Sequence, residues 1–212
     1  NYGFIVYSKS AVTFNYLRHY LGDSTMDAAM HQYFEANKFK HPYPKSVQMA
    51  LESTSGQNLD WFFDVIMSTT GKIDYKIKKV SFTNDSTIIK LKNRGLTVPV
   101  QLSLFDENAK VLDSIWVEGF ETDTTFRVKG VASNVVIDPN RIMPELIRDN
   151  NYFDKSRLLK KVEPLSFKFI GGVELPWKNQ IFYSPILGMN VPNGFMPGLL
   201  LYNHSIPARK FT

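Results

Sequence analysis

The spacing of apolar residues changes at Gly71, and this change constrains the fold more than any other feature of the sequence. Before Gly71, apolar residues recur three or four positions apart, which is typical of amphipathic helices. After it, short segments alternate between apolar and polar residues, as from Val98 to Leu104, which is typical of strands with one buried face. Helices followed by short strands predict an α+β fold.

Residues 1–72 are predicted to form four helices, of which the first runs from Val6 to Gly22. Each expected boundary falls at a residue type that commonly caps helices: Gly22, Asp23 or Ser24, Pro44, Gly56, Asn58 and Gly71. One apolar stripe of each of three helices is expected to face inward. The stripes consist of positions 7, 11, 14, 17 and 21 in the first helix, 26, 29, 30, 33 and 34 in the second, and 59, 62, 63, 66 and 67 in the fourth. Tyr7 is therefore expected in the first turn of the first helix, facing inward.

Residues 73–145 are predicted to form an antiparallel β-sandwich. Short alternating segments are separated by turn residues, and we expect strands at 75–82, 87–91, 98–104, 111–117, 125–128 and 135–137. Strands at this regular spacing favour two packed antiparallel sheets.

Residues 146–212 are predicted to be a basic linker and an irregular tail. Six of the eleven prolines and five of the twelve glycines lie between Pro164 and Pro207, interleaved with aromatic residues. We consider two interpretations of this tail. It is an ordered arm that fills grooves on the sandwich, or it is the start of a β-rich, membrane-associated region in which Tyr and Trp act as interfacial anchors.

The charge of the chain is concentrated in its last part. Residues 151–212 carry eight Lys and Arg against three Asp and Glu, whereas the rest is balanced. These cations precede a Pro- and Gly-rich stretch and do not form a basic face with interleaved aromatics, so we expect no nucleic-acid partner. The absence of cysteine excludes disulfides and thiolate chemistry. We favour a periplasmic or cell-surface location over a cytoplasmic one.

Six short motifs follow one another over residues 7–64. They are Tyr-Ser-Lys-Ser-Ala at 7–11, Leu-Gly at 21–22, Tyr-Phe at 33–34, a loop with two prolines at 41–44, Glu-x-x-Ser-Gly at 52–56, and Leu-Asp-Trp-Phe-Phe-Asp at 59–64. In this order they resemble the aminopeptidase N-like zinc metallopeptidases, the gluzincins with a thermolysin-like catalytic domain. Ser10 replaces the usual glycine and Ile66 the usual tryptophan, at positions that we expect to serve packing.

The resemblance implies a catalytic role for Tyr7. In these enzymes the matching tyrosine donates a hydrogen bond to the oxyanion that forms when zinc-bound water attacks the scissile carbonyl. Tyr2, five residues earlier, is expected to assist at the substrate. The resemblance also implies that residues 1–72 are the all-α C-terminal part of the catalytic domain, and that a β-sandwich follows.

The zinc ligands of this family are not found in the sequence. The family takes them from H-E-x-x-H and a glutamate on the next helix, tens of residues before the tyrosine. None of His19, His31, His41 and His204 is followed by Glu-x-x-His. His31 and Glu35 are four residues apart, but two groups are too few for a closed metal site. We therefore expect zinc in the parent protein, meaning the longer protein of which this chain would be a part, and none bound by this chain.

The chain, which has no initiator Met, leader or long apolar run, is interpreted as a fragment of a longer zinc aminopeptidase that removes N-terminal residues from peptides. Its partners would be the peptide substrate and the missing N-terminal part of the catalytic domain. Alone, it is expected to be inactive and to self-associate through its uncovered apolar face. The alternative is a non-catalytic peptidase-fold scaffold or adaptor of a membrane-associated protein.

Overall fold

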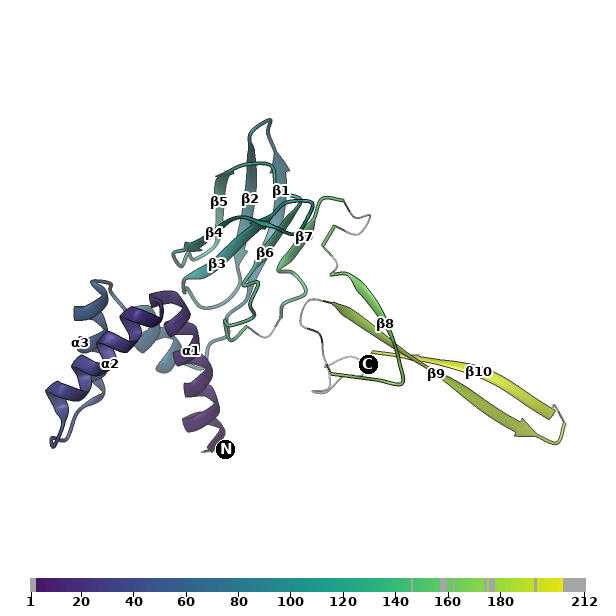
Figure 1. The fold of residues 1–212 in the computed structure, drawn as a ribbon, viewed down its shortest axis with the longest axis horizontal. Helices are drawn as coiled ribbons and strands as arrows, with labels where there is room; N and C mark the ends of the chain where they lie inside the picture. The colour runs from purple at the N-terminus through teal and green to yellow at the C-terminus, as the bar shows by residue number, and fades with distance from the viewer. Residues whose placement is uncertain are drawn as a thin grey trace. The chain divides into compact units, whose positions relative to one another are not determined.

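The computed structural model describes residues 3–145, 147–156, 160, 161, 163–173, 175, 178–192 and 194–203. The chain divides into two compact units, Asn1–Lys161 and Val162–Thr212. Figure 1 shows helices at the start of the first unit, strands in its remainder, and strands alone in the second unit. Within the described residues, no helix combines the length and the apolar character needed to cross a membrane.

The predicted helices are present, with two segments of π-helix among them. The helical elements are η1 (Phe4–Lys9), α1 (Ser10–Leu21), α2 (Asp23–Asn37), α3 (Pro44–Ser55) and η2 (Trp61–Met67), where η denotes a π-helix. Gly22 and Gly56 follow α1 and α3 with φ of 85° and 68°, values that a glycine adopts without steric cost. Asn58 was predicted to cap the last helix, but the N-cap residue of η2 is Asp60, and Asn58 Oδ1 accepts the N–H of Asp60 at 2.9 Å in the turn before it.

The helices bury partly different faces from those predicted. In α1 the buried residues are Thr13, Tyr16 and Leu17, and in α2 they are Met26 and Ala29. Phe34 was predicted to face inward, but it is 61% exposed. The predicted stripe of the last helix is confirmed, because its members are buried or packed against the core.

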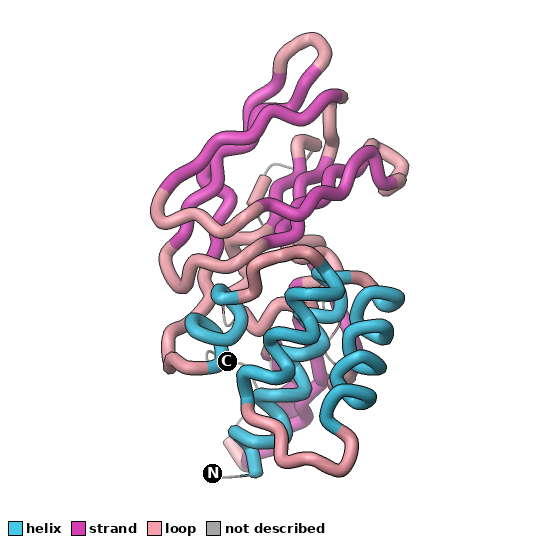
Figure 2. The backbone as a smooth tube through the Cα atoms, turned by 90° about the vertical axis from the view of Figure 1, so that its left-hand side faces the viewer, coloured by secondary structure: helices cyan, strands magenta, loops and turns pink. Residues whose placement is uncertain are grey.

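The strands of the first unit form two antiparallel sheets. One has the order β1 (Tyr75–Phe82), β2 (Ser86–Asn93), β5 (Asp123–Lys129), and the other the order β4 (Val111–Val117), β3 (Val100–Phe105), β6 (Asn134–Ile137), β7 (Tyr152–Asp154). Figure 2 shows the helices of residues 4–67 gathered beside these strands. The helices and antiparallel sheets confirm the α+β class, while the sandwich and the boundaries at residues 72 and 145 stay predictions.

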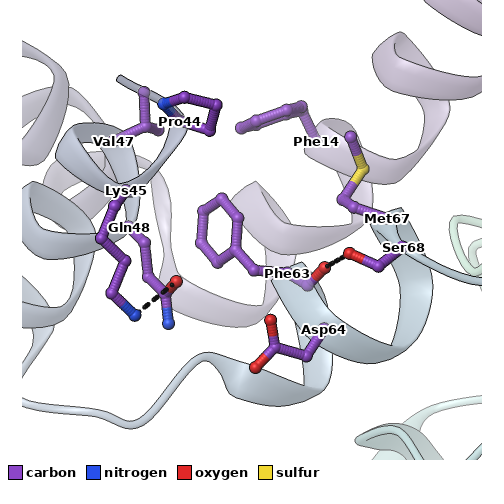
Figure 3. Close-up of a pocket in the computed structure, with 9 residues that line it drawn as sticks. All are labelled: Phe14, Pro44, Lys45, Val47, Gln48, Phe63, Asp64, Met67 and Ser68. Carbon is purple, nitrogen blue, oxygen red and sulfur yellow. Dashed lines mark hydrogen bonds between the residues drawn. The ribbon is translucent and has the colours of Figure 1, made fainter. Parts of the chain in front are cut away.

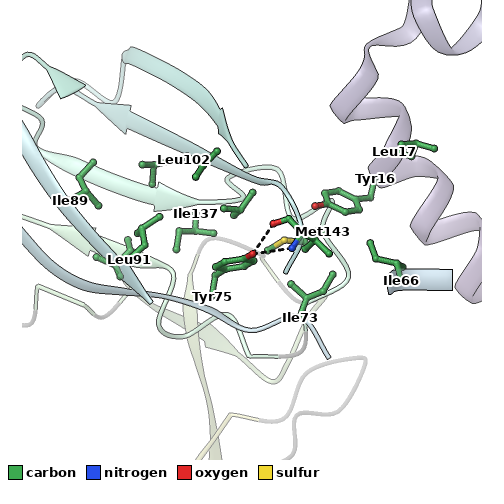
Figure 4. Close-up of a cluster of buried hydrophobic side chains, with 14 of the residues drawn as sticks. Tyr16, Leu17, Ile66, Ile73, Tyr75, Ile89, Leu91, Leu102, Ile137 and Met143 are labelled. Atoms are coloured by element: carbon green, nitrogen blue, oxygen red, sulfur yellow. Dashed lines mark hydrogen bonds between the residues drawn. The ribbon is translucent and has the colours of Figure 1, made fainter. Parts of the chain in front are cut away.

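One hydrophobic core joins the helices to both sheets. Alternate residues of the strands are fully or almost fully buried, among them Ile89, Leu91, Leu102, Leu104 and Val135. The same cluster contains Tyr16 and Leu17 of α1, Ile66 of η2, and Ile73 and Tyr75 at the start of β1 (Figure 4). Each large aliphatic side chain buried here stabilises the fold by about 1.5–3 kcal/mol. The helical residues are thereby fixed to the strands.

The second unit corrects the prediction of an irregular tail. It contains β8 (Leu165–Phe169), β9 (Asn179–Asn190) and β10 (Gly194–Tyr202), in the order β10-β9-β8. β9 and β10 are antiparallel, and β8 runs parallel to the first part of β9. Of the prolines and glycines that suggested irregular structure, Pro185, Gly188, Gly194, Pro197 and Gly198 lie within β9 or β10.

Candidate active site

Tyr7 lies in η1, and its side chain is 71% exposed. The prediction that it faces inward is therefore wrong. The side that α1 turns toward the core carries Thr13, Tyr16 and Leu17, whereas Ala11, another member of the predicted stripe, is exposed like Tyr7. Tyr2, the predicted substrate-binding residue, lies outside the described residues.

Contacts with η2 and with Thr69, two residues after its end, hold the helix that carries Tyr7. Lys9 Nζ donates to the backbone carbonyl of Thr69 at 3.2 Å. One turn later, the buried hydroxyl of Thr13 lies 3.4 Å from the sulfur of Met67, and the ring of Phe14 meets that of Phe62 edge-on at 5.1 Å. The backbone position of Tyr7 thus depends on a segment sixty residues further along the chain.

A buried amide organises the start of η2. Gln48, 3% exposed, donates from Nε2 to Glu52 Oε1 and to Asp60 Oδ1, both at 2.9 Å. Glu52 Oε1 also accepts the N–H of Leu59 at 3.0 Å. Glu52 and Asp60 of the matched motifs therefore serve structure. Sequence reasoning missed Gln48, although its position four residues before Glu52 is a usual spacing for a helical pair.

A cavity of about 430 Å³ opens between α1, α3 and η2 (Figure 3). Its lining residues are mainly apolar, with a few polar groups among them: Phe14, Pro44, Lys45, Val47, Gln48, Phe63, Asp64, Met67 and Ser68. Lys45 Nζ donates to Gln48 Oε1 at 2.9 Å, and Ser68 donates to the carbonyl of Phe63 at 2.7 Å. Tyr7 does not line this cavity, so the cavity and the candidate catalytic group are distinct features.

The described residues do not fit a zinc site. Within the part of the chain that the structure describes, no three His, Cys, Asp or Glu side chains gather closely enough to hold a metal ion. His19 Nδ1 lies 2.8 Å from the carbonyl of Asn15, and Glu35 pairs with Lys38 rather than with His31. Zinc in a catalytic site needs three protein ligands. The expectation that the chain alone binds no zinc stays a prediction.

Two buried carboxylates lie in the segment that connects β6 to β7. Glu145 Oε1 accepts the N–H of Tyr75 at 2.7 Å, and its other oxygen accepts from Asn151. Burial raises the pKa of Glu145 to about 7. Asp138 accepts the N–H groups of Ile142 and Met143, both at 2.9 Å, and burial raises its pKa.

These carboxylates serve structure, because their partners are the backbone and side chains of their own connection and of β1. Arg148 completes the arrangement by donating from Nη1 to Asp138 Oδ2 at 3.0 Å. Sequence reasoning missed Glu145, whose partner Tyr75 is seventy residues away and leaves no local signal.

Tyr16 is a tyrosine with a structural role in this fold, and it provides a comparison for Tyr7. It is fully buried, and its hydroxyl donates to the backbone carbonyl of Pro99. Burial raises its pKa well above the usual value. Its ring lies 5.5 Å from that of Trp61 and 6.0 Å from that of Trp116. Tyr7 differs from it in being exposed and free to meet a ligand.

Residues 1–66 match the model of the Peptidase family M1 domain. The structure is similar to aminopeptidase A of Legionella pneumophila in complex with aspartic acid, with a TM-score of 0.53 and 15% identity. That match covers 66% of this chain and 17% of the Legionella chain, so the present chain spans about a sixth of that protein. At this identity the likeness establishes a shared fold alone.

A β-glucosidase of Kluyveromyces marxianus also matches, with a TM-score of 0.22 and 12% identity over 44% of this chain and 17% of its own. That score is too low to support an argument. No curated protein matches the chain. The family match covers all six motifs that carry the resemblance noted in the sequence.

Proposed function

We propose that this chain, whose residues 1–66 match the model of the Peptidase family M1 domain, is part of a zinc-dependent aminopeptidase that removes N-terminal residues from peptides. The observation that carries the proposal is the family match over the segment that contains Tyr7. The similarity in fold to a protein named as an aminopeptidase supports the same class of reaction.

Tyr7 is proposed to donate its phenolic hydrogen bond to the oxyanion that develops on the scissile carbonyl. Two features support this role: the hydroxyl belongs to a side chain that is 71% exposed, and η1 is anchored through Lys9 and Thr69. A donor placed where charge appears only in the transition state contributes about 3 kcal/mol to lowering the barrier. Tyr2 is proposed to assist in binding the substrate.

Zinc would supply the activated water and polarise the carbonyl in such an enzyme. The described residues do not offer its ligands, and the family resemblance assigns those ligands to residues that precede Tyr7. We therefore propose that the fragment alone does not hydrolyse peptides, because it would lack the nucleophile and the general base.

The helical region is proposed to pack against the remainder of the catalytic domain. Large apolar or aromatic side chains of this region are exposed, including Tyr7 at 71%, Phe34 at 61% and Met49 at 62%. Covering them would remove apolar surface from water, at about 25 cal/mol per Å². In the isolated chain the same side chains favour self-association.

The reaction class is tested with the full-length parent protein and two versions of one peptide, one with a free and one with an acetylated N-terminus. An aminopeptidase is expected to release the first residue of the free peptide alone, and a zinc chelator should abolish this activity. Equal cleavage of both peptides would contradict the aminopeptidase assignment. No cleavage of either would favour the non-catalytic scaffold.

A further inference from the structure

The second unit ends in a long two-stranded ribbon made by β9 and β10. Their antiparallel register runs without interruption from Gly194 opposite Asn190 to Tyr202 opposite Phe182. β8 pairs with β9 only between Asn179 and Tyr183. Beyond Tyr183 the ribbon has no third strand among the described residues, and we name residues 184–192 and 194–200 the outer ribbon.

Both faces of the outer ribbon are apolar and exposed. Successive side chains of a strand point to opposite faces, and the neighbours Ile186 and Leu187 are 45% and 70% exposed. Leu199 and Leu200 on β10 are 63% and 46% exposed. Toward the tip, Met189 is 83% exposed. A sheet that packs on a protein core would instead have one apolar and one polar face.

The ribbon also lacks charge. Residues 179–203 contain no Asp, Glu, Lys, Arg or His, although 21% of the whole chain is charged. Charged side chains occur next to its base, where Lys168 on β8 is in register with Phe182 and Lys178 precedes β9. Tyr183 and Tyr202 lie at the same end, opposite Leu201 and Phe182. Along β9 the order from base to tip is Lys178, Tyr183 and then uncharged residues, while Lys168 lies level with Tyr202 and β8 at the base also exposes Phe167 and Phe169.

This order matches the polarity profile of a lipid bilayer. Lysine is attracted to anionic headgroups, tyrosine is enriched at the interface, and apolar side chains belong in the hydrocarbon. A groove on a protein would cover one face of the ribbon, whereas hydrocarbon would cover both. The seven residues from Ser184 to Asn190 extend over about 23 Å at 3.3 Å per residue, which is comparable to the hydrocarbon thickness of about 30 Å.

We propose that the outer ribbon inserts into anionic lipid bilayers, with Tyr183 and Tyr202 at headgroup level. The partner is a lipid surface, and the proposal does not depend on peptidase activity. Unpaired backbone groups at the strand edges are costly in hydrocarbon. The edges of β10, and of β9 beyond Tyr183, therefore pair with the ribbons of neighbouring copies in the bilayer.

Cosedimentation of the 1–212 chain with vesicles tests the proposal. With vesicles of phosphatidylcholine and phosphatidylglycerol at about three to one, the chain is expected to pellet, and it should do so less with phosphatidylcholine alone. Leu187→Asp and Leu199→Asp should each lower the apparent affinity by at least about tenfold, because a carboxylate in hydrocarbon is strongly unfavourable. Val111→Asp is the matched control, since Val111 is 52% exposed on β4, outside the ribbon.

A second measurement uses a nearly unaltered chain and does not depend on the folding of the Asp variants. The protein has no cysteine, so Phe195→Cys gives one labelling site near the tip for an environment-sensitive fluorophore. Vesicles should shift its emission to the blue and permit quenching from the lipid tails, whereas a label at Val111→Cys should not respond. A label at 195 that stays in water, or vesicle binding unchanged by both Asp variants, overturns the proposal. The proposal is also overturned if the chain does not bind vesicles but forms dimers in solution, and the Asp variants dissociate these dimers.

Discussion

The hydroxyl of Tyr16 in α1 donates a hydrogen bond to the backbone carbonyl of Pro99, next to the first residue of β3. Tyr16 is fully buried and Pro99 is buried as well. The tyrosine ring also packs between Trp61 of η2 and Trp116 of β4. One side chain therefore links the helical segment to the strands, and we expect the two to unfold together.

Tyr16→Phe is expected to lower the free energy of unfolding by about 1–3 kcal/mol, because it leaves the buried carbonyl of Pro99 without its donor. Urea denaturation followed by circular dichroism measures this change. Tyr7→Phe is the matched control, since Tyr7 is exposed, and it should change stability by no more than about 0.5 kcal/mol. Equal stability of the two variants would show that the Tyr16 contact contributes nothing.

Stability should decrease as the pH rises from about 4.5 to about 7. The pKa of Glu145 is raised from 4.5 to about 7 by burial, so the folded state binds its proton more tightly than the unfolded state. The resulting stabilisation is fully present below pH 4.5, the pKa of Glu145 in the unfolded chain, and it is lost as the pH rises through about 7, its pKa in the folded chain. It amounts to about 3 kcal/mol at most. Thermal unfolding at a series of pH values measures it.

The Glu145→Gln variant isolates this carboxyl. The amide keeps an acceptor for the N–H of Tyr75, and its NH₂ can face the buried oxygen of Asn151, which has no partner in the structure. The variant should lose most of the pH dependence between 4.5 and 7. Burial also raises the pKa of Asp138 from 3.8, so this group should contribute a slope of the same sign that begins near pH 3.8 and is retained in the variant. An unchanged slope in the variant would assign the effect to other groups.

Gly56→Ala should lower the free energy of unfolding by about 1–2 kcal/mol through backbone strain alone. Gly56 has φ of 68°, in the left-handed region, and an added Cβ would meet no atom within 4 Å. Gly56→Asn should cost less, since asparagine tolerates this conformation. If the Ala and Asn variants were equally destabilised, strain of the left-handed backbone at position 56 would not explain the loss of stability.

The sequence was sufficient where local patterns decide the structure. The bounds of β1 and β4 were predicted to the residue, because alternating side chains run between clear turn residues. The ribbon was missed because Pro185 and Pro197 suggested an interrupted chain. Both lie in strand segments with one edge that pairs with no other strand among the described residues, where a missing N–H is tolerated.

Features that depend on distant partners could not be predicted. The pairing of Glu145 with Tyr75 joins residues seventy positions apart, and only the fold brings them together. The inward orientation predicted for Tyr7 was wrong because the stripe was assigned to the wrong side of the helix: Thr13 and Tyr16 are buried, whereas Tyr7 and Ala11 are exposed. The chemical role of Tyr7 follows from the family resemblance and not from its local pattern.

The isolated chain should neither bind zinc in a fixed ratio nor hydrolyse an aminoacyl reporter. The described residues provide no cluster of metal ligands, and Tyr7 alone cannot generate a nucleophile. Elemental analysis after dialysis against zinc, together with a reporter assay, measures both properties. One zinc ion per chain accompanied by turnover would show that the fragment contains a complete site.

The most direct test of the catalytic account is the kinetics of Tyr7→Phe in the full-length parent. Because the hydroxyl is proposed to act on the oxyanion of the transition state, kcat/KM should fall by about 100-fold or more, mainly through kcat. Tyr43→Phe, another exposed tyrosine of the helical region, should leave both constants unchanged. A kcat/KM of the Tyr7→Phe variant within a factor of about three of the unaltered protein would contradict the oxyanion role of Tyr7.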